Sequence, residues 1–327
     1  MSTNGLVRRR TVLGAAAGTL AAPTIGRAQA WPNKPVRVVN AYSAGGTADV
    51  VCRIYCQALG EKLGQSFTVD NKPGAAGTIA AQIVARAPND GYTILYDATA
   101  QSVNPSLFAG KLAYDTQRDL LPIAQTMQTP VTLMRNAQFP AKTVPELITL
   151  AKSKPGALDC ASTGVGTVQH VSLELLNQKA GIKINHVPYK EMGSVRNDLF
   201  AGRIPLLFSN VPGTVALRSS KDVACMAHTG PRPVEVLPGV PAIAEVIPGF
   251  ETWEWNGLFA PAGTDPALIS RLNAEVNAVM KMEAVAKRLA ELGSLTRANT
   301  VAEFVAFRET QIAFFADMVK SADIRIE

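Results

Sequence analysis

Two short loops of mostly small residues, at positions 42–47 and 163–167, carry the groups best suited to hold a ligand. Each loop follows an apolar run typical of a β-strand and precedes a helix-like spacing of apolar residues. Glycine lets the backbone approach a ligand closely, and the first N–H groups of a helix have no partner within it. The loops therefore indicate two seats for a carboxylate or phosphate. The alternative is a pair of tight turns in which Thr47 or Asp49 only caps a helix.

Four side chains in or beside these loops could also support hydrolysis. Ser43, Asp49, Ser162 and His170 supply the residue types of a catalytic triad, provided that the two loops meet in space. The same side chains serve equally well as helix caps and ligand donors. A hydrolase therefore stays open as the alternative to a binding protein, and we assign no catalytic residue.

The sequence lacks the common cofactor motifs. It contains neither G-x-x-x-x-G-K-[ST] nor G-x-S-x-G, and no acidic residue follows Gly164 and Gly166 at the spacing that would hold a ribose. The histidines, His170, His186 and His228, stand apart from one another in the sequence. Because metal sites need clustered ligands, we expect no metal and no cofactor.

Residues 1–30 have the pattern of a secretory signal peptide. An arginine triplet at 8–10 precedes an acid-free apolar run at 12–22, and small residues ending at Ala30 form a cleavage pattern. The triplet favours the twin-arginine route, with an ordinary charged leader as the alternative. We expect the mature protein to begin after about Ala30 and to reside in the periplasm.

Loss of that segment makes the chain nearly neutral. The full chain has a formal net charge of +6, and removing Arg8, Arg9, Arg10 and Arg27 leaves +2. A basic stripe with interleaved aromatic residues is missing, which argues against nucleic-acid binding. The remaining chain also lacks an apolar stretch of about 20 residues, the length that a membrane-spanning helix needs.

The rest of the chain alternates strand-like and helix-like segments. Strands are expected at 36–39, 67–70, 92–96, 131–134, 158–162, 184–187, 204–208 and 223–227. Helices are expected near 50–59, 78–86, 143–153, 168–176, 195–200, after 212, at 264–280 and from 300. This alternation predicts an α/β fold with mainly parallel sheets, in which ligands bind beyond the carboxyl ends of strands. By that rule the segment 99–104 also lies near the site.

The restart of this alternation near position 129 predicts two domains. Domain 1 is expected to comprise residues 31–128 and 256–327, and domain 2 residues 129–255. The extended segment 253–261 returns the chain to domain 1, so the crossings near 129 and 255 would form a hinge. The helices at the C-terminus are expected to pack on domain 1.

Four cysteines leave one pairing open. Cys52 and Cys56 lie four residues apart on an expected helix, where core packing is favoured over a disulfide. Cys160 and Cys225 fall in two expected strands and could pair in an oxidising compartment. The sequence does not give their separation.

Several motifs, in order along the mature chain, resemble one family. They begin at 31–37 (WPNKPVR), 44–49 (AGGTAD), 71–77 (NKPGAAG) and 88–93 (PNDGYT), and continue at 104–108 (NPSLF), 186–190 (HVPYK) and 257–264 (GLFAPAGT). Together they resemble the Bug/TctC family, the extracytoplasmic solute receptors of tripartite tricarboxylate transporters. Tyr42, Ser43 and Cys160 depart from residues common in the family, which leaves the identity of the solute open.

The resemblance implies a receptor and not an enzyme. It implies a type II-like periplasmic binding protein of two α/β domains, each with a mixed, mainly parallel sheet, that close on a small carboxylate in the interdomain cleft. It also implies membrane permease subunits as partners of a monomeric receptor, with an organic, amino or aromatic acid as solute. The residues expected to bind the ligand are Tyr42, Ser43, Ala44, Gly45, Gly46, Thr47, Asp49, Thr99, Ser162, Thr163, Gly164, Val165, Gly166, Thr167, His170, Tyr189 and Asn210. A periplasmic hydrolase remains the alternative.

Overall fold

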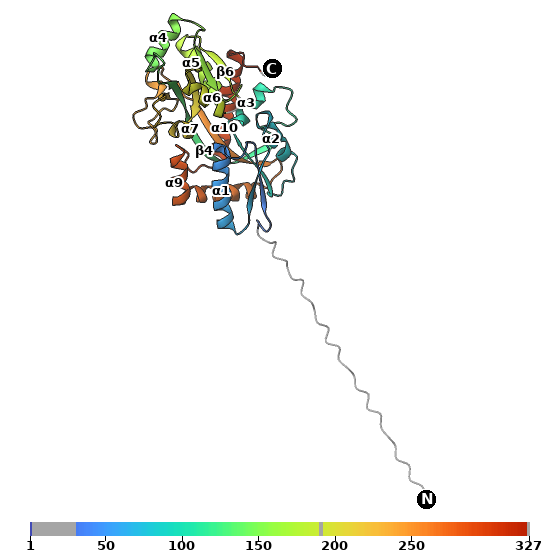
Figure 1. The fold of residues 1–327 in the computed structure, drawn as a ribbon. Helices are drawn as coiled ribbons and strands as arrows, with labels where there is room; N and C mark the ends of the chain where they lie inside the picture. The colour runs from blue at the N-terminus through green and yellow to red at the C-terminus, as the bar shows by residue number, and fades with distance from the viewer. Residues whose placement is uncertain (2–30, 190–191, 326–327) are drawn as a thin grey trace.

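The computed structural model describes residue 1, residues 31–189 and residues 192–325. The expected signal peptide therefore lies, apart from Met1, outside the described residues. Within the described ranges, the strands form one nine-stranded mixed sheet flanked by helices (Figure 1). The strands are β1 (Val36–Asn40), β2 (Phe67–Asn71), β3 (Thr93–Ala98), β4 (Leu120–Asn136), β5 (Asp159–Ser162), β6 (Asn185–Pro188), β7 (Leu206–Asn210), β8 (Val223–His228) and β9 (Trp253–Pro261).

Helices and short 3-10 turns fill the connections. They are α1 (Thr47–Leu63), η1 (Ala75–Gly77), α2 (Thr78–Ala85), α3 (Ala100–Leu107), α4 (Val144–Ser153), α5 (Val168–Ala180), α6 (Met192–Phe200), α7 (Val211–Val215), η2 (Ile243–Glu245), α8 (Pro266–Met280), α9 (Glu283–Glu291) and α10 (Val301–Ser321). None of the helices in the described ranges combines the length and apolar character needed to cross a membrane.

Strand β4 joins two halves of the sheet. From Leu120 to Pro130 it pairs with β9, and from Val131 onward it pairs with β7 and β8. The strand order is β2-β1-β3-β9-β4-β7-β5-β6, with β8 also on β4. Figure 1 shows the resulting arrangement, with α1 and α9 at one end of the molecule and α4, α5 and β6 at the other. The expected strand at 131–134 is thus only the last part of a longer strand.

The prediction of a mixed sheet is confirmed, but parallel pairs do not predominate. β1 pairs in parallel with β2 and β3, and β5 pairs in parallel with β6 and β7. Every pairing that involves β4 or β9 is antiparallel. The two long strands in the middle of the sheet run opposite to their neighbours, so each half contains both kinds of pair.

Helix α10 departs from the expected packing on one domain. Phe304 near its start packs in a hydrophobic cluster with Trp255 and Phe259. Phe315, further along the helix, packs in a different hydrophobic cluster with Val131, which lies in the part of β4 that pairs with β7. The helix has 21 residues and is therefore about 30 Å long, enough to reach both halves.

All four cysteines are free, which answers the question left open by the sequence. Cys160 lies on β5 and Cys225 on β8, and strands β7 and β4 stand between them. At about 4.8 Å per strand step, three steps separate these residues by roughly 14 Å, far beyond the reach of a disulfide. Cys52 and Cys56 lie on α1 and are buried in a hydrophobic cluster, in agreement with a packing role.

Candidate functional site

Asp49 organises the first loop from within. The buried carboxylate accepts hydrogen bonds from the N–H of Gly45 (2.9 Å), Nε of Arg53 (2.8 Å), Nδ2 of Asn71 (2.8 Å) and Nδ2 of Asn40 (3.2 Å). Burial alone would raise the pKa of Asp49, but the bonds from Arg53, Asn71 and Gly45 outweigh it and lower the pKa to about 2. Asp49 is therefore a fixed anion that shapes the loop.

A pair of stacked histidines supports the second loop. The rings of His170 and His186 lie 3.6 Å apart, centroid to centroid. Nδ1 of His170 accepts the N–H of Gly166 (3.1 Å), and Nε2 of His186 lies 2.6 Å from Oγ of Ser162. Burial lowers the pKa of His170 to about 3, with a further contribution from His186, and lowers that of His186 to about 4. Both rings are neutral at pH 7 and act as structural hydrogen-bonding groups.

The four candidate hydrolase residues do not assemble a triad. Ser162 is bonded to His186 and not to His170, and it also accepts the N–H of Gly164 at 3.1 Å. Asp49 is engaged in the first loop, where its partners are Gly45, Arg53 and the two asparagines. A triad needs a serine, a histidine and a carboxylate bonded in series. The described side chains offer no such series at these positions.

Between the two loops lies a cavity of ≈ 440 Å³, called here the cleft cavity. Its lining includes ten of the residues expected to bind the ligand: Tyr42, Ser43, Gly46, Thr47, Thr99, Thr163, Val165, Gly166, Thr167 and Asn210. It also includes Ala100, Val103 and Asn104, from the segment 99–104 that was expected near the site. The residues that were not expected are Ala48, Ala76, Ala98, Leu107, Val168, Gln169 and Glu254. The first and second loops thus face each other across one shared cavity.

Seven expected residues lie outside this lining: Ala44, Gly45, Asp49, Ser162, Gly164, His170 and Tyr189. Most of them hold the loops in shape by the hydrogen bonds described above. The hydroxyl of Tyr189 donates to Asp198 of α6 at 2.7 Å, so this side chain binds a residue of its own half of the molecule and not the cleft cavity. For these residues the structure supports a positioning role.

Direct contacts join the two sides of the cleft cavity. Nδ2 of Asn210 donates to Oγ1 of Thr47 at 3.4 Å, which links the end of β7 to the start of α1. Gly166 packs so closely on α3 that a Cβ at this position would lie 2.4 Å from Cδ2 of Leu107. Its φ of +76° also falls in the region that favours glycine. The cavity is therefore closed over by contacts from both halves.

Three helices begin at the wall of the cleft cavity. Thr47 and Ala48 open α1, Ala100 follows the N-cap of α3, and Val168 and Gln169 open α5, and all of them line the cavity. In the described structure, the N–H groups of Thr47, Ala48, Ala100 and Val168 donate to no protein acceptor. Unpaired N–H groups at helix N-termini favour an anion.

Within the part of the chain that the structure describes, the lining carries no lysine, arginine or histidine, and its titratable side chains are Tyr42 and Glu254. Burial raises the pKa of Tyr42 well above its ordinary value, with smaller contributions from Asp97 and Glu254, so the phenol stays protonated. Burial also raises the pKa of Glu254 to about 7, against a hydrogen bond from Gln169 that lowers it. Asp97, fully buried at the end of β3, has its pKa raised to about 7 for the same reason. Sequence inspection missed Glu254, whose only signal was an acid between two tryptophans.

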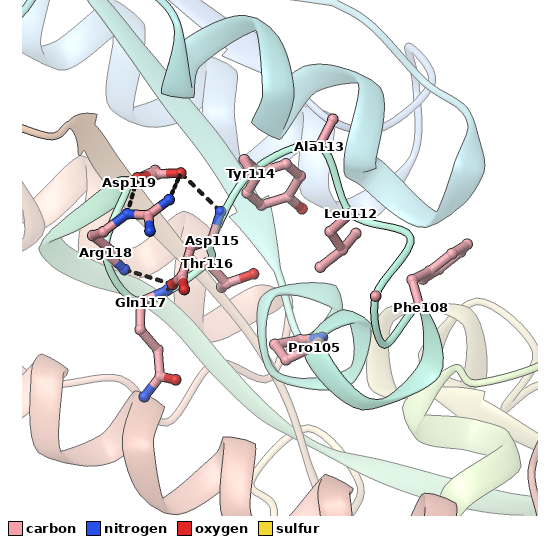
Figure 2. Close-up of a pocket in the computed structure, with 11 residues that line it drawn as sticks. Pro105, Phe108, Leu112, Ala113, Tyr114, Asp115, Thr116, Gln117, Arg118 and Asp119 are labelled. Carbon is pink, nitrogen blue, oxygen red and sulfur yellow. Dashed lines mark hydrogen bonds and ion pairs between the residues drawn. The ribbon is translucent and has the colours of Figure 1, made fainter.

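Figure 2 shows a second hollow, of ≈ 520 Å³, formed mainly by the segment that follows α3. Its charged groups are already paired, because Arg118 Nε lies 2.8 Å from Asp119 and the N–H of Asp115 donates to Asp119 at 2.8 Å. None of the residues expected to bind a ligand lines this hollow. Across the described ranges, histidine, cysteine and acidic side chains form no cluster that could hold a metal ion. The cleft cavity is the candidate site.

Residues 51–321 match the family described as Tripartite tricarboxylate transporter family receptor, or TctC. The chain belongs to this family. Solved structures that are similar to this chain share its fold, and they confirm the expected α/β binding-protein fold.

Three relatives illustrate the similarity. The "UPF0065 protein in tcbD-tcbE intergenic region" of Pseudomonas sp. (strain P51) is 35% identical over 292 residues, which are 88% of this chain and 87% of the relative. The structure of R. palustris Rpa4515 with adipate has a TM-score of 0.82 at 31% identity and covers 90% of this chain and 99% of its own. MatC of Rhodopseudomonas palustris with bound malate has a TM-score of 0.77 at 29% identity, covering 88% and 99%.

Proposed function

We propose that this TctC-family receptor captures a small carboxylate-bearing solute in the cleft cavity and delivers it to a tripartite tricarboxylate-type permease. The observation that carries the proposal is the meeting of three helix N-termini, those of α1, α3 and α5, at one cavity. Their free N–H groups and the hydroxyls of Thr47, Thr99 and Thr167 can hold a carboxylate without a cationic side chain. Adipate and malate in the related structures belong to the same ligand class.

The proposed capture uses two lobes that move about a hinge. Residues 31–128 with 256–327 would form one lobe and residues 129–255 the other. The change of partners along β4, from β9 at Pro130 to β7 at Val131, supports a boundary near 129. The contact between Gly166 and Leu107 would then be made on closure and broken on opening. Since α10 packs on both halves, it would have to bend or shift with the motion.

Binding without turnover is the favoured chemistry. The neutral, buried His170 and His186 support the second loop, and Asp49 is held by four donors in the first. None of these groups is arranged to activate a nucleophile that faces the cavity. The proposal therefore includes no catalytic residue and no cofactor.

The receptor is proposed to act in the periplasm as a monomer that docks on the permease. The segment 1–30 would direct export, by the twin-arginine route, and be removed after about Ala30. Export in the folded state suits a protein whose four thiols are all free.

Calorimetric titration of protein stripped by unfolding and refolding tests this proposal. The probes are adipate, malate, aspartate and 6-aminohexanoate, with mass spectrometry of each probe after incubation. We expect at least one carboxylate to bind with heat and to be recovered unchanged. If every carboxylate fails to bind, or if the bound probe is converted, the receptor function is wrong.

A matched pair of variants locates the binding. Gly46 lines the cleft cavity with an ordinary backbone conformation, and a Cβ there meets only the carbonyl of Ser43 at 3.5 Å. Gly46→Val should fold normally and weaken binding about a hundredfold, because its side chain stands before the N–H groups of α1. Gly193→Val on α6, where an added Cβ has open space, is the control that should bind as the parent does.

A further inference from the structure

Glu254 is an acidic side chain in a cavity otherwise built for anions. It lies on β9 opposite Thr129 of β4, where the two halves of the sheet join, and it lines the cleft cavity. Its hydrogen-bond partner in the described structure is Nε2 of Gln169, at a distance of 3.4 Å. An ionised carboxylate can accept several hydrogen bonds, so this one long bond leaves most of its capacity unused.

Among the residues that the structure describes, no cationic side chain contributes to the pKa of Glu254. Tyr42, from the loop after β1, lies close enough for Glu254 to raise its pKa, and it is not cationic. From α5 Glu254 meets the uncharged Gln169, and from β4 the uncharged Thr129. Burial without a cation raises the pKa of Glu254 to about 7. A cation brought by the ligand would restore the ionised form.

A dicarboxylate and an amino carboxylate differ sharply in how they suit this cavity. The second carboxylate of a dicarboxylate would share the cleft cavity with Glu254, and two close carboxylates repel unless one takes up a proton. A protonated amine carries three donors and a positive charge, and a partly buried carboxylate with free acceptors complements both.

We propose that Glu254 binds a protonated amine, so that the solute is an amino carboxylate whose carboxylate lies at the helix N-termini and whose ammonium group lies at Glu254. This inference rests on the proposed receptor function and adds the class of solute. Gln169 donates a hydrogen bond from its amide to Glu254 and can thereby hold the Glu254 side chain in place. Glu254 is then the residue that determines specificity at this end of the cavity.

Matched pairs of ligands separate charge from shape. Calorimetric titrations at pH 7.5 compare adipate with 6-aminohexanoate, glutarate with 5-aminopentanoate, and succinate with 4-aminobutanoate, using the parent chain and Glu254→Gln. Glutamine keeps the size and the hydrogen bond to Gln169 but cannot carry a negative charge. Glu235→Gln removes one charge from an exposed position and serves as the control. Circular dichroism verifies that every variant is folded.

In the parent, we expect the amino carboxylate of at least one pair to bind tenfold or more tightly than its dicarboxylate, about 1.4 kcal/mol. Glu254→Gln should reverse that preference, and Glu235→Gln should keep it. If the parent binds the dicarboxylates as tightly or more tightly, or if Glu254→Gln leaves the preference unchanged, the role of Glu254 is wrong while the receptor function stands. If the parent binds no member of either series, the proposed class of solute is wrong, and the receptor function is then decided separately by the titrations with malate and aspartate.

Discussion

Replacing Asp49 by asparagine tests whether this carboxylate holds the first loop in shape. The hydrogen bonds from Arg53, Asn71 and Gly45 overcome the effect of burial and lower the pKa of Asp49 from 3.8 to about 2. That difference corresponds to about 2 kcal/mol of folding free energy at neutral pH. Asparagine keeps the size, but its amide nitrogen cannot accept these bonds and its oxygen carries no charge. We therefore expect Asp49→Asn to be less stable than the parent by about 2 kcal/mol at pH 7.

The stability difference between the parent and Asp49→Asn should depend on pH in a defined direction. A carboxyl with a lowered pKa contributes stability above the pKa of the unfolded chain, 3.8, and loses that contribution as the pH falls toward about 2. The difference between parent and Asp49→Asn should thus be constant near neutrality and shrink below pH 4. The same variant should bind the solute more weakly, because Gly45 loses the acceptor that fixes the loop.

Urea unfolding followed by circular dichroism measures the stability difference, and calorimetry measures binding. Asp317→Asn, an exposed aspartate on α10, is the control for loss of one negative charge. If Asp49→Asn unfolds at the same urea concentration as the parent and binds equally well, Asp49 does not organise the loop. If it folds and binds but abolishes a demonstrated turnover, the hydrolase alternative would return.

Three further predictions concern the second loop and the leader. Gly166→Ala should weaken binding and destabilise the closed form, because its Cβ would lie 2.4 Å from the side chain of Leu107. Adding Leu107→Ala should recover part of the affinity. An unchanged calorimetric affinity of the single variant would refute the close approach of Gly166 to Leu107. His170→Gln should retain binding. Burial lowers the pKa of His170 from 6.5 to about 3, so protonation of this side chain destabilises the folded parent as the pH falls below 6.5, by up to about 1.4 kcal/mol per pH unit. His170→Gln should lack this contribution. Identical pH profiles of the two proteins in urea unfolding would contradict the prediction. Arg9→Lys combined with Arg10→Lys should block export, and mature double variant in the periplasm would show a general secretory signal instead.

Local features of the site were predictable from the sequence because their partners lie close along the chain. Thr300 and Glu303 form a capping box at the start of α10, and Thr143 caps α4. The glycine and threonine loops after β1 and β5 follow patterns of a few residues, and both line the cleft cavity. Short-range hydrogen bonding and backbone conformation decide all of these features.

Contacts between distant segments could not be predicted in this way. The sequence offered His170 as the histidine that could join Ser162 in a triad. The parallel pairing of β5 with β6, with Cys160 opposite His186, brings His186 to Ser162 instead. Helix α3 contains Pro105 and few apolar residues, so its sequence resembles a loop, yet it forms a wall of the cavity.

Glu254 shows the same limit most clearly. Its neighbours Trp253 and Trp255 suggest a crossing strand, and only the pairing of β9 with β4 reveals that the carboxyl group lines the site. An acid between two tryptophans carries no local pattern that distinguishes a ligand contact from a packing position.

A crystal structure of the protein purified with its retained solute tests the central claim most directly. We predict a carboxylate in the cleft cavity, with its oxygens within hydrogen-bonding distance of backbone N–H groups at the starts of α1, α3 or α5. A solute bound elsewhere, or bound in the cavity with no carboxylate oxygen near these N–H groups, would contradict the account.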